Sequence, residues 1–560
     1  MKKIIAERVG EILICLIVFL ITLGNFSLVT DDYAYFMSSL AAKQFSDFAY
    51  FDVHFQGFIG IREVYKLHYY FVPNINWHFV YGIIYEFISL YLLIRVFRIV
   101  VLRDIRNVFF IRITQILVAL FFIENIVFVS HTRVSLMFCG IALFNLAFTR
   151  QIQSKDVIFN SLLFVFGMLL RPESSMGMLL LAAAGYLIYS PDMQGLVKRI
   201  SMPAFAVFVF LVIFTIDWTY TDIFVRKVEP EIEYKMMAKR VVDISGMKTA
   251  LDSVKYEAAL AGMWFDMKEV SPQFMRSIIL PGADLRIVHA KDIFNHVCGF
   301  YFYYSFILCT AIVLLLLGIV FLPNYWTIAL KMVGLLVSTF VIVYALDYNG
   351  FLVSNRHFLS IQIISLLIFS FYFFDAATLK NVENKKIILT TALLFLFAGA
   401  CLSIAKYKSE NVLVDKSVNS MSQTMNEFER KYSGRIVAAS IDGRFLFDQH
   451  FYLTNEIYRR NTYLMFDWFT FPLTPRYENY LSRTCKCDAN NPVTFFRWLA
   501  DSKALYLATP NRFNLTQKYM HTIHGCDIIF GNPVKLNSLT GIDNLDTKDC
   551  EIRTVSLAGN

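Results

Sequence analysis

Charged residues are scarce in this chain of 560 residues, because Asp, Glu, Lys and Arg together make up only 17% of it. A soluble globular protein carries about 25%. This shortage excludes a disordered protein and a coiled coil, and it argues against an ordinary soluble enzyme.

Other patterns are also missing from the sequence. No alternation of apolar and polar residues over segments of about ten residues dominates, which argues against a membrane β-barrel. No internal repeat is evident, which counts against a transporter built from paired halves. The C-terminal region lacks the phosphate-binding patterns GxxxxGK[ST] and GxGxxG.

Apolar residues, in contrast, make up 57% of the chain, with 55 Phe and 30 Tyr. They gather in blocks of about 20 residues, the length that a helix needs to cross a bilayer. The sequence therefore predicts an α-helical polytopic membrane protein with about eleven transmembrane helices. The predicted spans lie near residues 10–29, 77–99, 108–130, 134–149, 157–170, 174–189, 199–217, 298–321, 326–345, 357–375 and 386–404.

The positions of Lys and Arg predict the orientation. Basic residues cluster in the loops on the side of the N-terminus, which places that side in the cytoplasm. The net charge of +8 is then explained by these loops, and nucleic acid is not an expected partner. We expect a multi-pass protein of the cell inner (plasma) membrane whose first span is a signal anchor and whose C-terminal domain is extracytoplasmic.

Two domains are expected. Residues 1–404 form a transmembrane domain with external loops at 30–76 and 218–297, and residues 405–560 form an extracytoplasmic α/β domain. In the latter, residues 435–441, 504–508 and 527–530 are predicted strands. Asn491 and Pro492 are typical of a helix start and predict a helix through Trp498.

Four cysteines of the C-terminal domain are disulfide candidates: Cys485, Cys487, Cys526 and Cys550. An oxidising compartment favours two disulfides, with three possible pairings. Free thiols are the alternative. A third is a zinc site of Cys485, Cys487 and Cys526 with His521 or His524, although Cys-x-Cys is not the usual zinc spacing.

Three short external loops each carry one arginine, Arg133, Arg171 and Arg356, against the rule that basic residues stay inside. Arg171 precedes Pro172, which breaks a helix. The pair Asp31-Asp32 follows the first span on the same side. Arginines bind lipid phosphates, and a carboxylate takes a proton from an acceptor hydroxyl. These residues favour glycosyl transfer from a lipid-phosphate sugar.

Structural roles for the same residues stay open. The acidic pair is also a good helix N-cap. Arg171 could form a structural ion pair with Glu173 or another carboxylate. Arg356 and His357 could extend their polar ends to the membrane interface without binding a ligand. Glu86 and Glu124 are acids within predicted spans, either hydrogen-bonded inside the bundle or lining a site.

In its layout, the chain resembles the GT-C superfamily of membrane glycosyltransferases, which includes protein O-mannosyltransferases and aminoarabinose transferases. The shared features are a cytoplasmic N-terminus, an acidic pair opening the first external loop, here Asp31-Asp32, and many further spans. The resemblance implies a polyprenyl-phosphate-linked sugar as donor and a glycan, lipid or protein as acceptor. Asp31 and Asp32 would be catalytic, Asp31 with a role in holding a divalent metal ion. Arg171, Arg356, His357 and Arg133 would bind the donor phosphate.

Three other functions remain under consideration. One is an O-antigen-type polymerase or ligase that uses a lipid-diphosphate donor, another is a transporter or flippase, and the last is a membrane scaffold or receptor without activity. If the protein is a scaffold or receptor, the acidic pair and the external arginines can be replaced without loss of function.

Overall fold

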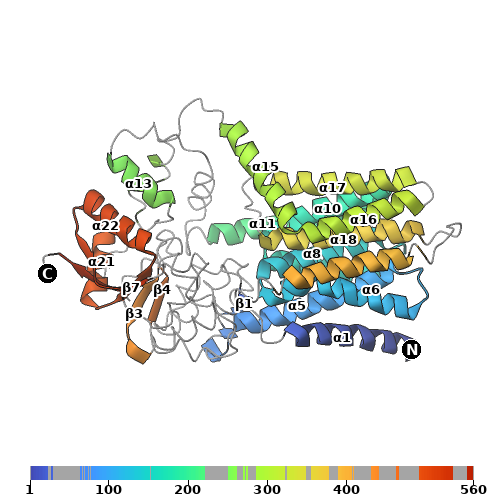
Figure 1. Cartoon of the computed structure of the whole chain (residues 1–560), viewed down its shortest axis with the longest axis horizontal. Coiled ribbons are helices and arrows are strands. Elements are labelled where there is room, and N and C mark those ends of the chain that lie inside the picture. Colours follow the sequence, from blue (N-terminus) through green and yellow to red (C-terminus); the bar gives the residue numbers. More distant parts are fainter. Residues whose placement is uncertain are drawn as a thin grey trace. The chain divides into compact units, whose positions relative to one another are not determined.

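A computed structural model of the chain shows a mostly helical protein with a small sheet (Figure 1). The described residues form two compact units. The helical unit comprises Met1–Phe26, Tyr81–Val212 and Ala290–Val412, and the sheet unit comprises Ser27–Val80, Ile213–His289 and Leu413–Asn560. The structure describes residues 2–22, 27–28, 77–151, 153–220, 250–260, 285–321, 325–348, 355–377, 389–406, 430–439, 462–465, 491–533 and 551–558, with scattered positions in 64–75 and 266–274 and at 387 and 408.

Helices of the helical unit run side by side in a bundle, with the N-terminus at one end of it (Figure 1). Its elements are α1 (Lys2–Thr22), α5 (Trp77–Val96), the π-helix η1 (Phe97–Val101), α6 (Val108–Phe121), α7 (Ile123–Val127), α8 (His131–Phe148), α9 (Ser154–Leu170), α10 (Pro172–Tyr189), α11 (Met193–Tyr220), α15 (Leu285–Tyr303), α16 (Ser305–Phe321), α17 (Tyr325–Tyr348), α18 (Asn355–Ala377) and the helix Leu389–Lys406.

Four helices in the described part of the chain are long and apolar enough to cross a membrane. They are His131–Phe148, Trp326–Asp347, His357–Ala376 and Leu389–Lys406. A fifth span is formed if α15 and α16, which meet at a bend of 78°, are taken as one broken helix. The prediction of a helical protein with membrane-spanning segments is supported, and eleven spans are not confirmed.

Helices α8 and α18 form the centre of the bundle. Their apolar windows are 94% and 89% buried, against 28% for α17. Two glycines allow α8 to pack closely against α18 and α9. A Cβ on Gly140 of α8 would lie 2.6 Å from Cγ1 of Ile364 on α18, and one on Gly167 of α9 would lie 2.7 Å from Sγ of Cys139 on α8. Small residues allow such contact between membrane helices.

Several helix boundaries differ from the predicted spans. Helix α1 begins at Lys2 and α15 at Leu285, well before the predicted starts at 10 and 298. Both helices start with charged residues that favour helix formation. Hydropathy detects only the apolar block that follows, so the predicted spans start later than the helices. The predicted span 108–130 is interrupted at Phe122, where α6 ends and α7 follows.

The sheet unit contains a mixed five-stranded sheet in the order β4-β3-β5-β7-β6. Strands β3 (Ile436–Ala439), β4 (Thr462–Met465) and β5 (Leu505–Ala508) are parallel. Strand β7 (Glu551–Leu557) is antiparallel to β5 and to β6 (Ile528–Phe530). The predicted strands at 435–441, 504–508 and 527–530 are confirmed within a few residues. The short strands β1 (Ser27–Leu28) and β2 (Phe128–Val129) lie elsewhere in the chain.

Aromatic rings fill the core beside the central strand β5, whose four residues are all buried. The ring of Tyr506 lies 5.3 Å from that of Phe530 and 5.5 Å from that of Phe513, and Phe513 lies 4.8 Å from Phe530. Such ring pairs stabilise a core beyond the area they bury.

Two capped helices accompany the sheet. In α21 (Pro492–Asp501), the side chain of Asn491 accepts a hydrogen bond from the amide of Val493, which confirms the predicted helix start. Helix α22 (Pro510–His524) begins after Thr509 and ends at Gly525, which has a φ of 59° in the left-handed region. Glycine adopts that conformation without strain.

The segment between α11 and α15 belongs to the sheet unit as well. Oδ2 of the buried Asp266 accepts hydrogen bonds from the hydroxyl of Tyr519 at 2.8 Å and from Nε2 of His524 at 2.6 Å, both on α22. Glu257 of α13 (Ala250–Leu260) pairs with Lys518 at 2.7 Å. The described residues around Glu257 and Asp266 therefore pack against α22 within the sheet unit.

The pKa of Asp266 follows from this setting. Burial raises it, but the hydrogen bonds from His524 and Tyr519 and the charge of His524 outweigh burial, so the pKa lies below its usual value. The stabilisation that Asp266 provides is present above the usual carboxyl pKa. It is lost as the pH falls through the lowered value.

We predict that Asp266→Asn lowers the free energy of unfolding of the sheet unit by about 3 kcal/mol at pH 7, because one partner of a buried polar pair is removed. The difference from wild type should shrink as the pH falls toward 3. Thermal unfolding of the full-length protein in detergent measures both effects. Glu257→Gln, in an exposed ion pair, is the control and should cost less than about 1 kcal/mol. Equal losses in both variants at pH 7 would contradict the assignment.

Candidate functional site

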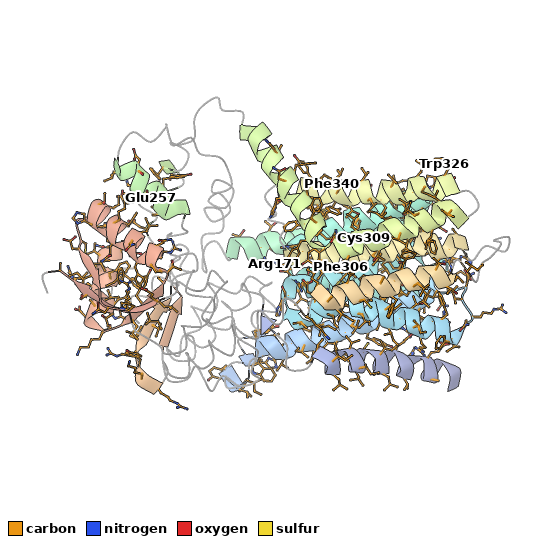
Figure 2. All side chains as sticks on the ribbon, viewed as in Figure 1. Arg171, Glu257, Phe306, Cys309, Trp326 and Phe340 are labelled. Atoms are coloured by element: carbon orange, nitrogen blue, oxygen red, sulfur yellow. The ribbon has the colours of Figure 1, made fainter. Side chains whose placement is uncertain are left out.

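One end of the helical unit, here called the Arg171 end, is where α8, α10 and α18 begin and where α9 and α17 end. The hydroxyl of Ser135 on α8 donates to the carbonyls of Gly167 at 2.6 Å and Arg171 at 3.1 Å. A Cβ on Gly177 of α10 would lie 2.9 Å from Cδ1 of Leu346 on α17. In Figure 2, Arg171 and Trp326 mark opposite ends of the bundle.

Arg171 lies at the predicted helix break. Helix α9 ends at Leu170, Arg171 has extended backbone angles with a φ of −155°, and α10 begins at Pro172. The ring of Pro172 cannot continue the preceding helix, which explains the break. The side chain of Arg171 is partly exposed. The chain thus places an arginine where the backbone is interrupted between two apolar helices.

At this end, the buried carboxylate of Glu124 on α7 forms ion pairs with two basic side chains. Arg133 of α8 donates to the Glu124 carbonyl at 2.8 Å and to its Oε1 at 3.2 Å. The hydroxyl of Tyr304 donates to Oε1 at 3.0 Å, and Nζ of Lys406 lies 3.4 Å from Oε2. Glu124 is 6% exposed and Arg133 4%. Two cations, Arg133 and Lys406, thus contact one buried carboxylate.

Lys406 has a second attachment. Its ammonium lies 3.6 Å from the ring centre of Tyr303 and 3.8 Å from that of Tyr304. Cation–π contacts of this kind hold a cation beside an apolar surface. The last turn of the helix Leu389–Lys406 is thereby joined to the bend between α15 and α16.

A second acid–base pair lies nearby in the helical unit. Nδ1 of His296 on α15 is 2.9 Å from Oδ2 of Asp347 on α17. Asp347 is 1% exposed, whereas the His296 side chain is 48% exposed. A buried carboxylate that orients an accessible imidazole is suited to proton transfer.

One face of α15 connects the two polar groups. His296, Phe300 and Tyr304 follow at intervals of four residues, the spacing of one helix face. The ring of Phe300 lies 4.4 Å from that of His296 and 5.2 Å from that of Phe358 on α18, and Tyr304 lies 6.0 Å from Phe358. Packed aromatic rings, which are buried, therefore connect the His296–Asp347 pair with Glu124.

The remaining predicted site residues are placed only in part. His357, partly exposed, lies in the first turn of α18, next to Phe358, and Arg356 lies in the same turn. The side chain of Arg356 and the whole of Asp31 and Asp32 lie outside the described residues. Arg133, Arg171 and the start of α18 are thus brought to one end of the bundle, and the position of the acidic pair stays a prediction.

Sequence reasoning did not identify His296, Tyr304 or Lys406 as parts of this site. Their partners are 51, 180 and 282 residues away in the chain. The four-residue spacing of His296, Phe300 and Tyr304 was the available signal. The predicted span begins at 298, and the polar start of α15 therefore falls in the predicted loop 218–297.

The opposite end of the bundle, here called the Asp375 end, is basic. Asp375 of α18 accepts hydrogen bonds from Arg103, from Arg150 at 3.3 Å and from the Tyr189 hydroxyl at 2.7 Å. Lys331 donates to the Tyr189 carbonyl at 2.7 Å. Arg103 and Arg150 lie in the loops 100–107 and 150–156 between predicted spans, on the side of the N-terminus.

Cys526 is the one disulfide candidate that the structure describes, and it has a free thiol. Burial raises the pKa of this thiol, Arg497 lowers it and Asp527 raises it again, so the pKa is above its usual value. His521 pairs with Asp527 and His524 with Asp266, each at 2.6 Å. The predicted pair of disulfides is therefore not seen at Cys526. Cys485, Cys487 and Cys550 lie outside the described residues, and a disulfide among them stays a prediction.

Within the described ranges, no three or more His, Cys, Asp or Glu side chains form a group that could hold a metal ion. The residue that the resemblance implies for a divalent ion, Asp31, lies outside these ranges.

We predict that Glu124→Gln destabilises the helical unit by about 3 kcal/mol, because Arg133 and Lys406 lose their shared negative partner. Tyr304→Phe removes one hydrogen bond to the same carboxylate and keeps the ring, and it should cost about 1 kcal/mol. Unfolding of the detergent-solubilised protein by heat compares the two. A Glu124→Gln protein as stable as wild type would show that the carboxylate does not hold this end together.

Comparisons with known proteins gave no match. No protein-family model matches the chain, no curated protein matches it, and no solved structure matches it. No family is shown for the chain, so its function is proposed from its own residues.

Proposed function

We propose that the chain is a membrane glycosyltransferase that moves a sugar from a polyprenyl-phosphate donor to a glycan, lipid or protein acceptor. The reaction takes place on the extracytoplasmic face of the cell inner (plasma) membrane. One observation carries the proposal. The Arg171 end of an otherwise apolar bundle gathers ionisable residues: Arg133, Arg171, His357, Glu124, Asp347, His296 and Lys406.

Ionisable residues buried within a bundle of apolar membrane helices, such as Glu124, Arg133 and Asp347, are costly and mark functional sites by default. Arg133 and Lys406 both pair with the buried carboxylate of Glu124. Arg171, whose side chain is partly exposed, lies at the same end of the bundle. A lipid phosphate, which is anionic, is the ligand that such a surface attracts.

Contacts inside the sheet unit support the proposal that the segments 218–297 and 405–560 lie on the same side of the membrane. Asp266, which precedes α15, bonds Tyr519 and His524, which follow the helix Leu389–Lys406. Two segments in contact must lie on the same side of a membrane, so an even number of crossings separates them. The bent pair α15–α16, α17, α18 and Leu389–Lys406 provide four. This parity agrees with the external placement proposed for 218–297 and 405–560.

The charge at the two ends supports the orientation. Arg103, Arg150 and Lys331 gather at the Asp375 end. Arg112 of α6 donates to the carbonyl of Glu7 near the start of α1 at 3.1 Å. Positive residues favour the cytoplasmic side. The Arg171 end then faces outward, as a surface-glycan enzyme requires.

The proposed reaction uses the acidic pair as well. Arg171, Arg356 and His357 bind the donor phosphate. Asp32 takes the proton of the acceptor hydroxyl, whose oxygen forms a bond to C1 of the sugar while the bond from C1 to the phosphate oxygen breaks. Polyprenyl phosphate leaves, stabilised by the cations. Asp31 orients the acceptor or contributes to a divalent-ion site.

Arg133 has a positioning role in this scheme. Its guanidinium is 4% exposed and donates to both the carbonyl and the side chain of Glu124. It therefore fixes Glu124, which in turn holds Lys406 near the surface. We propose that Lys406, whose side chain is 17% exposed, contacts the donor phosphate in place of Arg133.

We predict that Asp32→Asn reduces transfer by about 10²–10⁴-fold, the usual contribution of a general base. Arg171→Ala should lower kcat/KM by about 10–100-fold, the effect of losing one charge-assisted hydrogen bond. Proteoliposomes supplied with a panel of labelled polyprenyl-phosphate sugars measure transfer. Lys155→Ala, an exposed residue at the start of α9, is the control and should transfer at the wild-type rate. Full activity in both test variants would refute the proposed mechanism.

The lipids that copurify with the protein separate the proposal from its alternatives. A polyprenyl phosphate or its glycosylated form, present with wild type and lost with Arg171→Ala, supports it. A lipid-diphosphate oligosaccharide would favour a polymerase or ligase. Uptake of substrate into vesicles without a new covalent product would favour a transporter.

A further inference from the structure

A cavity of about 420 Å³ lies at the Asp375 end of the helical unit, between α1 and the η1 region. Four arginines line it, Arg8, Arg95, Arg98 and Arg103, together with Glu7 and Glu11. The lining therefore carries two more positive than negative charges. This cavity is distinct from the Arg171 end, and the proposed reaction does not use it.

The arginines differ in how far their charge is compensated. Arg95 lies 3.4 Å from the buried Glu11, and Arg103 pairs with Asp104 and Asp375. Arg98 donates only to the carbonyl of Leu102, at 3.1 Å, which is a neutral partner. Arg8 makes no hydrogen bond or ion pair with any residue that the structure describes. Two guanidinium groups at the cavity thus lack a carboxylate.

The surroundings of the cavity are apolar and exposed. Ile99 lines it and is 46% exposed. Leu13, Leu16 and Leu20, on α1 beyond Arg8, are 51%, 44% and 65% exposed. Acyl chains cover such residues in a bilayer. The acyl chains of a lipid whose headgroup enters the cavity would lie along this exposed apolar face of α1.

The backbone at the cavity is also unusual. Arg98 and Ile99 belong to η1, where the amide of Leu102 bonds the carbonyl of Phe97, five residues back. Short π-helical turns occur frequently at functional sites.

We propose that this cavity binds the phosphate of an anionic lipid headgroup from the leaflet on the side of the N-terminus. Arg8 and Arg98 contact the phosphate oxygens, and Arg95 and Arg103 supply the surrounding positive potential. Basic pockets between membrane helices bind anionic headgroups by this chemistry. Bound lipid fixes α1 against α5 and η1.

The test is native mass spectrometry of the full-length protein, delipidated in detergent and titrated with dioleoyl phosphatidic acid. Wild type should bind one lipid. Arg8→Gln and Arg98→Gln should each weaken binding about tenfold, the loss of one charge-assisted hydrogen bond. Arg98→Lys, which keeps the charge, should lose less. Arg106→Gln is the matched control, because Arg106 is exposed near the same end but does not line the cavity.

Three outcomes would overturn the proposal. One is equal lipid affinity in wild type and all variants. Another is equal binding of dioleoyl phosphatidylcholine, which has no net charge. The third is displacement of the lipid by millimolar inorganic phosphate, which would assign the cavity to a soluble anion. Arg8→Gln decides the matter if Arg98→Gln fails to fold, because Arg8 is exposed and makes no hydrogen bond or ion pair with the described residues.

Discussion

A carboxylate with little access to water is stable only where cations and hydrogen-bond donors surround it. Glu124 and Asp375 meet this condition at opposite ends of the helical unit. Glu124 binds residues 9, 180 and 282 positions away, and Asp375 binds residues 186, 225 and 272 positions away. Both carboxylates therefore connect helices that the chain order leaves far apart. Apolar packing alone would let these helices slide, since lipid and helix surfaces are equally apolar. The two ends thus fix the register in which α8, α18 and their neighbours pack.

Local features of the fold were predictable from the sequence because their causes are local. Blocks of apolar residues mark most of the helices, and Pro172 explains the break at Arg171. Short apolar runs gave three strands of the sheet. Helix α22 also carried a readable signal, Thr509 before Pro510, which the sequence prediction did not use.

Nonlocal features were not predictable in the same way. Hydropathy places Glu124 in the membrane, but nothing near it in sequence identifies Tyr304 or Lys406 as partners. The pairing of His296 with Asp347 depends on how α15 lies against α17. Arg133 is the clearest example. The sequence places it in a short external loop, and only the structure shows that its side chain is buried against Glu124.

The contact between Asp266 and α22 has a consequence for the order of events during synthesis. Asp266 and Tyr519 are 253 residues apart. At about 5–20 residues per second, the ribosome needs roughly 10–50 s to make the residues between them. Four helices that could cross the membrane lie in that interval, counting the bent pair as one. The sheet unit is therefore completed only after the last of them has been made, and until then the Asp266 carboxylate must remain in water or be held by another partner.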